Sequence, residues 1–193
     1  MALVGLLALQ GAFREHRLVL ESLGVPTREL RQKKDIDGID ALVLPGGEST
    51  TIGKLLDDLD MMEPLRSRLK AGMPAFGTCA GMIMLADQIE GKDQPRLGGM
   101  NMTVRRNAFG RQVDSFEADL DMPELGTTPF SAVFIRAPLI LATGPEVKTL
   151  ATVQHKDSRF PVAVRQNNLL ACSFHPELTG DTRIHQYFLD LIH

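Results

Sequence analysis

The chain has 193 residues, of which 44% are hydrophobic and 23% are charged, a composition typical of one globular domain. We therefore expect residues 1–193 to form a single domain. A formal net charge of −3 excludes a strong positive field for nucleic acid, and two cysteines are too few for a disulfide scaffold. The apolar run at residues 2–9 is too short to cross a bilayer, so we expect a soluble, cytoplasmic protein.

Apolar runs that alternate with helical patterns predict a mainly parallel sheet. Residues 2–9, 26–30 and 41–44 are typical of strands that are buried on both faces, and residues 12–23 carry a helical stripe. Strand, helix and strand at this spacing favour right-handed crossovers between parallel strands. Expected next are a helix capped by Ser49 or Thr50, a helix at 61–71, a strand at 73–76 and a helix at 82–86.

The pattern changes after residue 90, where short strand-like runs are separated by turn residues. Their spacing predicts hairpins, so the sheet should gain antiparallel strands, and Asp181 should open a last helix. The predicted fold class is therefore α/β, with a mostly parallel central sheet, flanking helices and added antiparallel strands. The short strands are expected at residues 100–105, 113–118, 132–136, 139–142, 149–154, 161–166 and 169–174.

The stretch Gly77-Thr78-Cys79-Ala80-Gly81 joins a strand-like run to a helix-like run, which is the pattern of a nucleophile elbow with cysteine as the nucleophile. Glycine at both ends suits this strained turn, because a Cβ atom there would collide with neighbouring backbone. The turn places Cys79 at a helix N-terminus, where the partial positive charge favours a thiolate. A lone cysteine at such a junction is also a common core residue, so the assignment depends on the other groups.

A cysteine nucleophile needs a base, and His175 is the best candidate among the five histidines. It follows the apolar run 169–174, at the strand end where open α/β sheets place their chemistry. Glu177 lies two positions on, so in extended backbone it would face the same way and orient the imidazole. Pro176 is expected to stiffen this segment and to prevent a helix. A surface loop is the alternative for this tripeptide alone, and Cys172 is expected to be a core residue.

Gly46-Gly47 follows the strand-like run 41–44 and provides a candidate oxyanion hole. Attack of a thiolate on an acyl group creates an oxyanion that two backbone N–H groups can stabilise. We expect one donor from Ala80 and the other from Gly47. A diglycine also permits a peptide flip, so this second donor could depend on an ordering event. A plain turn is an alternative, whereas a phosphate-binding loop is disfavoured because no lysine follows at the required spacing.

These motifs together resemble those of class I (triad-type) glutamine amidotransferases. The resemblance rests on the elbow at residues 77–81 and on His175-Pro176-Glu177, and no triad position departs from the pattern. It covers essentially the whole chain and is most specific for the glutaminase subunits of pyridoxal 5′-phosphate synthases. The segments that carry this finer resemblance are residues 9–11, 45–51, 106–112, 114–117 and 134–138.

The resemblance implies a three-layer, flavodoxin-like fold and hydrolysis of L-glutamine to L-glutamate and ammonia. In that reaction Cys79 would be the nucleophile, His175 the proton shuttle and Glu177 the group that orients His175. No metal or organic cofactor is implied. The ammonia would pass to a synthase subunit, a barrel-shaped partner that forms a large ring assembly and activates the glutaminase. The residues implied to bind glutamine are Gly47, Glu48, Ser49, Arg106, Ile135 and Arg136.

Gln10 ends the first predicted strand at the same sheet edge as Cys79. It could sense the partner and hold the Gly46-Gly47 peptide in its oxyanion-donating orientation, or it could cap the first helix. Three other functions compete with the main interpretation: a glutaminase that serves another synthase, a redox or chaperone-like protein of the related cysteine-elbow fold, and a non-catalytic binding subunit, against which the intact triad argues. The segments 106–112 and 134–138 argue against the first, and the His-Pro-Glu ending argues against the second.

Overall fold

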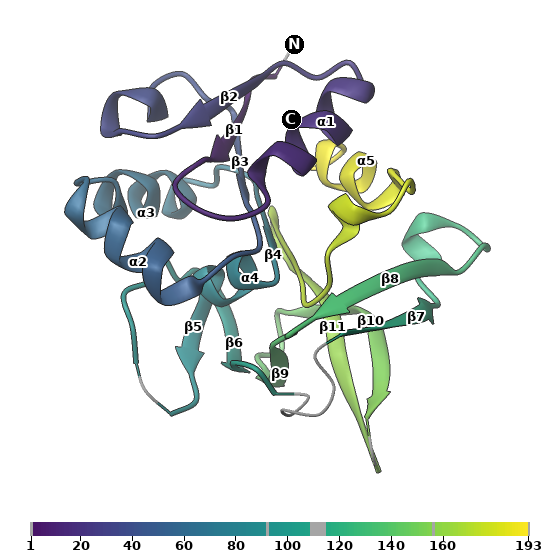
Figure 1. The fold of residues 1–193 in the computed structure, drawn as a ribbon. Helices are drawn as coiled ribbons and strands as arrows, with labels where there is room; N and C mark the ends of the chain where they lie inside the picture. The colour runs from purple at the N-terminus through teal and green to yellow at the C-terminus, as the bar shows by residue number, and fades with distance from the viewer. Residues whose placement is uncertain (1, 92, 109–114, 156, 193) are drawn as a thin grey trace.

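A seven-stranded sheet forms the centre of the computed structural model (Figure 1), which describes residues 2–91, 93–108, 115–155 and 157–192. The strand order is β10-β11-β12-β4-β3-β1-β2. The strands from β12 to β2 pair in parallel, whereas β10, β11 and β12 pair antiparallel. In chain order these strands are β1 (Val4–Leu7), β2 (Thr27–Leu30), β3 (Ala41–Leu44), β4 (Ala75–Thr78), β10 (Lys148–His155), β11 (Ser158–Gln166) and β12 (Leu169–Cys172).

Helices cover both faces of this sheet, with α1 and α5 on one face and α2 and α3 on the other (Figure 1). The α/β class, with helices on both faces of a mostly parallel sheet, is confirmed. None of the helices in the described ranges is long and apolar enough to cross a membrane. Their bounds are α1 (Phe13–Ser22), α2 (Ser49–Asp58), α3 (Met62–Lys70), α4 (Ala80–Leu85) and α5 (Arg183–Leu189).

The apolar character of β3 follows from its position between two cores. Leu42 and Leu44 pack in a cluster with α2 and α3, whereas Val43 packs in a second cluster with Leu20 of α1 and Phe188 of α5. Successive residues of a strand point to opposite faces, so a strand that is covered on both sides needs an uninterrupted apolar run. The same reasoning explains why β1 and β12 are buried along their whole length.

The remaining strands form two smaller sheets, with the orders β5-β6-β9 and β7-β8. The expectation that the central sheet gains antiparallel strands is therefore confirmed for β10 and β11. The strands β6 to β9, which were also expected to be antiparallel additions, belong to the smaller sheets. Residues 113 and 114, where one strand was expected to start, lie outside the described residues. The bounds are β5 (Ala86–Ile89), β6 (Met100–Arg105), β7 (Ser115–Leu120), β8 (Phe130–Ile135) and β9 (Leu139–Thr143).

The expected end of α4 and the expected cap of α2 are wrong. The helix expected to include Ala86 ends at Leu85, because Ala86 adopts an extended conformation and begins β5. The cap of α2 is Glu48, whose carboxylate accepts from the N–H of Thr50 at 3.4 Å and from its hydroxyl at 3.0 Å. Ser49 is therefore the first residue of the helix, and its hydroxyl is available for a different contact.

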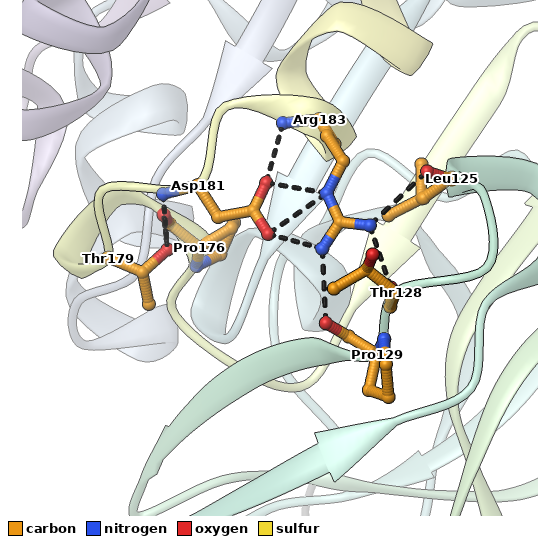
Figure 2. Close-up of polar contacts among 7 residues, drawn as sticks. All are labelled: Leu125, Thr128, Pro129, Pro176, Thr179, Asp181 and Arg183. Atoms are coloured by element: carbon orange, nitrogen blue, oxygen red, sulfur yellow. Dashed lines mark hydrogen bonds and ion pairs between the residues drawn. The ribbon is translucent and has the colours of Figure 1, made fainter.

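Arg183 holds the C-terminal segment against the loop that connects β7 and β8 (Figure 2). Its guanidinium donates to both carboxylate oxygens of Asp181, at 3.0 Å and 2.6 Å. Asp181 also accepts from the N–H of Arg183 at 3.0 Å. The N-cap of α5 is Thr182, which makes no side-chain cap hydrogen bond, so the helix opens after the expected residue Asp181. The guanidinium further donates to the backbone oxygens of Leu125, Thr128 and Pro129, at 3.3, 2.8 and 3.1 Å.

Candidate active site

Three neighbouring parallel strands bring the predicted groups to one edge of the central sheet. Cys79 follows β4 directly. On one side of β4 lies β12, which leads to His175, and on the other side lies β3, which leads to Gly46-Gly47. The carboxyl ends of parallel strands meet at the same edge, so the strand order places the nucleophile between the base and the diglycine.

Cys79 sits in a strained turn. Its backbone has φ 50° and ψ −106°, values that a residue with a side chain rarely adopts. The N–H of Cys79 donates to the backbone oxygen of Cys172 at 2.8 Å, which ties the turn to β12. A Cβ atom on Gly77 would lie 2.4 Å from the oxygen of Gly81, and one on Gly81 would lie 1.9 Å from the oxygen of Leu44. The expected requirement for both glycines is confirmed.

His175 connects Cys79 to Glu177. Its Nδ1 lies 2.7 Å from Oε1 of Glu177, and both its ring and Cys79 line the same cavity. Burial lowers the pKa of His175, but the hydrogen bonds and negative charges of Cys79 and Glu177 outweigh burial and raise it to about 10. The imidazole therefore carries its second proton at neutral pH, which is the form needed to protonate a leaving group.

The backbone after His175 is not extended, in contrast to the expectation. Pro176–Leu178 forms a 3₁₀ turn, η3. Proline is tolerated there because it occupies the first helical position, where an N–H would have no partner in the helix. The turn still brings Glu177 back to His175, so the predicted pair forms through a different local geometry. The N–H of His175 donates to Val133 of β8 at 2.8 Å, which holds this segment in place.

The diglycine loop is held by the turn that precedes α1. The N–H of Ala12 donates to the oxygen of Gly46 at 3.0 Å. Because the peptide unit is planar and trans, the N–H of Gly47 points away from Ala12. A Cβ atom on Gly46 would lie 2.4 Å from Cε1 of His175, so glycine allows the loop to approach the imidazole closely.

Gln10 contacts the same loop rather than the first helix. Its Oε1 accepts from the N–H of Glu48 at 2.7 Å. The N-cap of α1 is Ala12, without a side-chain hydrogen bond, so Gln10 does not cap this helix. The side chain is therefore placed to influence the backbone next to Gly47.

A cavity of about 350 Å³ opens at this edge of the sheet. Every predicted site residue except Glu177 lines it, and Glu177 lies behind His175 with its side chain fully buried. In the described part of the chain, no group of three or more His, Cys, Asp or Glu side chains could hold a metal ion. The predicted residues in the lining are Gln10, Gly47, Glu48, Ser49, Cys79, Ala80, Arg106, Ile135, Arg136 and His175.

Some cavity residues were not predicted from the sequence. Ile83, Asn107 and Pro138 also line the cavity. Asn107 and the predicted residue Arg136 both have positive φ, 46° and 45°. Strained backbone of this kind is frequent at functional sites, but the sequence pattern around these two residues does not predict it.

Gln94 joins two predicted residues of the cavity. Its Oε1 accepts from Oγ of Ser49 at 3.2 Å and from Nη1 of Arg106 at 3.1 Å. Its side chain is buried, although it lies in a polar loop that gave no signal in the sequence. Arg106 opens the segment 106–112, of which residues 109–112 lie outside the described part of the chain, as does Asp114.

A buried histidine pair lies behind the triad. His16 of α1 places Nε2 3.0 Å from Oγ1 of Thr78 and 3.4 Å from Oε2 of Glu177, and its Nδ1 lies 2.9 Å from Nε2 of His185. The side chain of His16 is completely buried. Burial, with the nearby His185 and His175, lowers the pKa of His16 well below its usual value, and burial lowers the pKa of His185 to about 4. Both side chains are therefore neutral at neutral pH.

Acid is expected to destabilise the fold through His185. The pKa of His185 is about 4 in the native state and about 6.5 in the unfolded chain, so the unfolded chain binds this proton more tightly. The free energy of unfolding is therefore unaffected by this group above pH 6.5 and decreases as the pH falls from 6.5 towards 4. Linkage gives a loss of about 2 kcal/mol in the free energy of unfolding between pH 7.5 and pH 5. Urea titrations of the wild type and of His185→Gln measure this. The wild type should lose about 2 kcal/mol more than the variant, and equal losses would contradict the assignment.

The sequence pattern of the SNO glutamine amidotransferase family matches residues 6–193. The chain belongs to this family. A relative from Carboxydothermus hydrogenoformans, named pyridoxal 5′-phosphate synthase subunit PdxT, is 56% identical over 189 residues, which are 98% of this chain and 97% of the relative. The relative of the same name from Moorella thermoacetica is 58% identical over 98% of both chains.

A solved structure of a glutamine amidotransferase matches the chain with a TM-score of 0.90, at 51% identity and over 98% of each chain. The resemblance to glutamine amidotransferases and the flavodoxin-like fold that it implies are thereby confirmed. The individual site residues stay predictions, which the geometry above brings together around one cavity.

Proposed function

We propose that this chain hydrolyses L-glutamine to L-glutamate and ammonia as the glutaminase subunit of a pyridoxal 5′-phosphate synthase. The observation that carries the proposal is the placement of Cys79 between His175 and Gly46-Gly47, at the ends of three adjacent parallel strands. Membership of the glutamine amidotransferase family, and full-length relatives named as synthase subunits, support it.

In the proposed reaction the Cys79 thiolate attacks the side-chain amide carbon of glutamine. The tetrahedral oxyanion collapses, the C–N bond breaks, and the His175 imidazolium gives its proton to the leaving nitrogen, so ammonia departs and a γ-glutamyl thioester remains. Water then attacks the thioester while neutral His175 takes its proton, and cleavage of the C–S bond releases glutamate. Glu177 keeps Nδ1 of His175 occupied, which leaves the other ring nitrogen for these transfers.

The oxyanion would be stabilised by the N–H groups of Ala80 and Gly47. Ala80 is the first residue of α4, directly after the nucleophile, and both Ala80 and Gly47 line the cavity. The contact from Ala12 to Gly46 fixes this peptide from outside the site, and Gln10 fixes the next one through Glu48. Gln10 is thus proposed to hold the donor orientation when the partner docks.

The remaining cavity residues have donor and acceptor groups that suit an amino acid. Arg106 and Arg136 offer guanidinium groups for the α-carboxylate, and the carboxylate of Glu48 can accept from the α-ammonium. The backbone oxygen of Ile135 lies 3.9 Å from Sγ of Cys79, so it can accept from the amide nitrogen next to the reacting carbon. Ser49 and Arg106 share Gln94 as an acceptor, which keeps both side chains at the same wall.

The ammonia is proposed to pass to the synthase subunit, a barrel-shaped protein that forms a large ring assembly and stimulates the glutaminase on docking. The reaction needs no metal or organic cofactor in this chain, because the nucleophile, base and oxyanion donors are all protein groups. A reactive thiolate requires a reducing environment, in agreement with the cytoplasmic location expected from the sequence.

Ammonia release from L-glutamine, with and without the purified synthase subunit, tests this function. The partner should raise kcat/KM at least about fivefold, within the usual range of coupling between two sites. L-Asparagine, one methylene shorter, should react at least about tenfold more slowly. Absence of glutamine-dependent release under both conditions would reject the function. In the same assay, unchanged stimulation of Gln10→Ala would reject only the role of Gln10.

A further inference from the structure

The buried pair of His16 and His185 has no part in the proposed chemistry, yet it contacts the triad directly. Both side chains are completely buried, and His16 lies between Thr78, which precedes the nucleophile, and Glu177. The second carboxylate oxygen of Glu177, Oε2, makes no hydrogen bond among the described residues, and Nε2 of His16 lies 3.4 Å from it. A buried carboxylate oxygen without a donor is costly, so the proton on His16 matters.

The surrounding atoms indicate where that proton lies. Burial and the nearby histidines lower the pKa of His16, so its ring is neutral and carries one proton. With the proton on Nδ1, the lone pair of Nε2 would face Oε2 of Glu177, and the N–H of His185 would lie on its own Nδ1, which has no acceptor. With the proton on Nε2, His16 presents its N–H both to Oγ1 of Thr78, at 3.0 Å, and to Oε2 of Glu177, at 3.4 Å. His185 then donates from Nε2 to Nδ1 of His16 at 2.9 Å. In this arrangement Nδ1 of His185 carries a lone pair without a donor, and no N–H group of the two rings is left without an acceptor.

We propose that His16 is a positioning residue for the triad, which donates from Nε2 to Oε2 of Glu177 and so fixes the carboxylate that orients His175. This inference rests on the proposed function. The carboxylate of Glu177 then has one oxygen for each histidine: Oε1 lies 2.7 Å from His175 and Oε2 lies 3.4 Å from His16. The second distance is long for a hydrogen bond, and such contacts commonly tighten when substrate binds.

The position of His16 gives α1 two contacts with the reaction site. The turn before this helix holds the oxygen of Gly46 through Ala12, and the body of the helix holds Glu177 through His16. Figure 1 shows α1 beside α5, which carries His185. The same helix therefore supports both the oxyanion loop and the acid-base pair.

Two amide substitutions separate positioning from packing. The side-chain nitrogen of Gln at position 16 can reach the place of Nε2 and donate to Glu177, whereas that of Asn reaches only the place of Nδ1. With the synthase subunit present, His16→Gln should keep kcat within about threefold of wild type, and His16→Asn should lower it about 10- to 100-fold, the usual effect of losing an outer hydrogen-bond partner. KM for glutamine should stay within about twofold in both, since His16 does not line the cavity.

Urea titration of both variants corrects the rates for the fraction of folded protein. If wild type releases no ammonia above a protein-free blank, the proposed function fails. If wild type is active and the two variants have equal kcat, whether high or low, the positioning role of His16 is overturned while the function stands. A rise in KM without a fall in kcat in His16→Asn would overturn it as well.

Discussion

Replacement of Cys79 by alanine is expected to lower partner-stimulated ammonia release at least about a thousandfold, because the covalent route through a thioester is lost. The methyl group of alanine fits the elbow without new contacts, since it keeps the Cβ atom of the cysteine. The fold should therefore be retained, and the strained backbone at φ 50° should persist, because Gly77, Gly81 and the hydrogen bond to Cys172 hold it. Steady-state ammonia release per folded protein is the measurement.

Cys172→Ala provides the matched control. Cys172 is the only other cysteine, and its side chain is fully buried within β12. Burial raises the pKa of its thiol well above the usual value, and the charges of Glu177 and Cys79 act in the same direction. We expect this variant to lose about 1 kcal/mol of stability but to keep activity within about threefold. Iodoacetamide should label Cys79 and spare Cys172, and comparable losses of activity in the two variants would contradict the nucleophile assignment.

The elements that can be read from the sequence are those with a purely local cause. β3 was predicted at residues 41–44 and is found there, because a strand covered on both faces needs an uninterrupted apolar run. The elbow could be predicted for the same kind of reason: only glycine satisfies the close approaches at positions 77 and 81. The order of the strands follows from the crossover rule only in part, and the parallel contact of β12 with β4 becomes evident in the structure.

The failures have a cause outside the local pattern. The cap of α2 is Glu48 and not Ser49, because Ser49 is drawn into a contact with Gln94, 45 positions along the chain. The turn after His175 is 3₁₀ rather than extended: the N–H of His175 before it is held by Val133 of β8, and proline is permitted at its first position. Gln94 itself could not be found from the sequence, since a glutamine in a polar loop has no distinctive surroundings until the loop packs.

The elbow that carries Cys79 and the diglycine loop that faces it are held by different kinds of contact. The elbow is fixed by backbone contacts that leave no room for movement, whereas the diglycine loop depends on side-chain and turn contacts from Gln10 and Ala12. A partner that docks near the start of α1 could alter the second without disturbing the first. Regulation of the proposed enzyme is therefore expected to act on oxyanion stabilisation and to leave the thiol in place.

Gly81→Ala is expected to destabilise the protein by about 3 kcal/mol or more, at or beyond the upper end of typical overpacking costs. The new Cβ atom would lie 1.9 Å from the oxygen and 2.6 Å from the carbonyl carbon of Leu44. Both are backbone atoms of β3, so no side chain can rotate to relieve the overlap. Either α4 must move away from the sheet or the end of β3 must shift.

Both movements would damage the site as well as the fold, because α4 begins next to Cys79 and β3 leads to Gly46-Gly47. The folded fraction of Gly81→Ala should therefore release ammonia at least about tenfold more slowly, as misplaced oxyanion donors predict. Gly180→Ala is the control, since nothing lies within 4 Å of its Cβ position, and its stability should change by less than about 1 kcal/mol. Urea titration and ammonia release measure the two effects. If Gly81→Ala were as stable and as active as Gly180→Ala, close packing of the elbow against β3 could not be what holds the nucleophile.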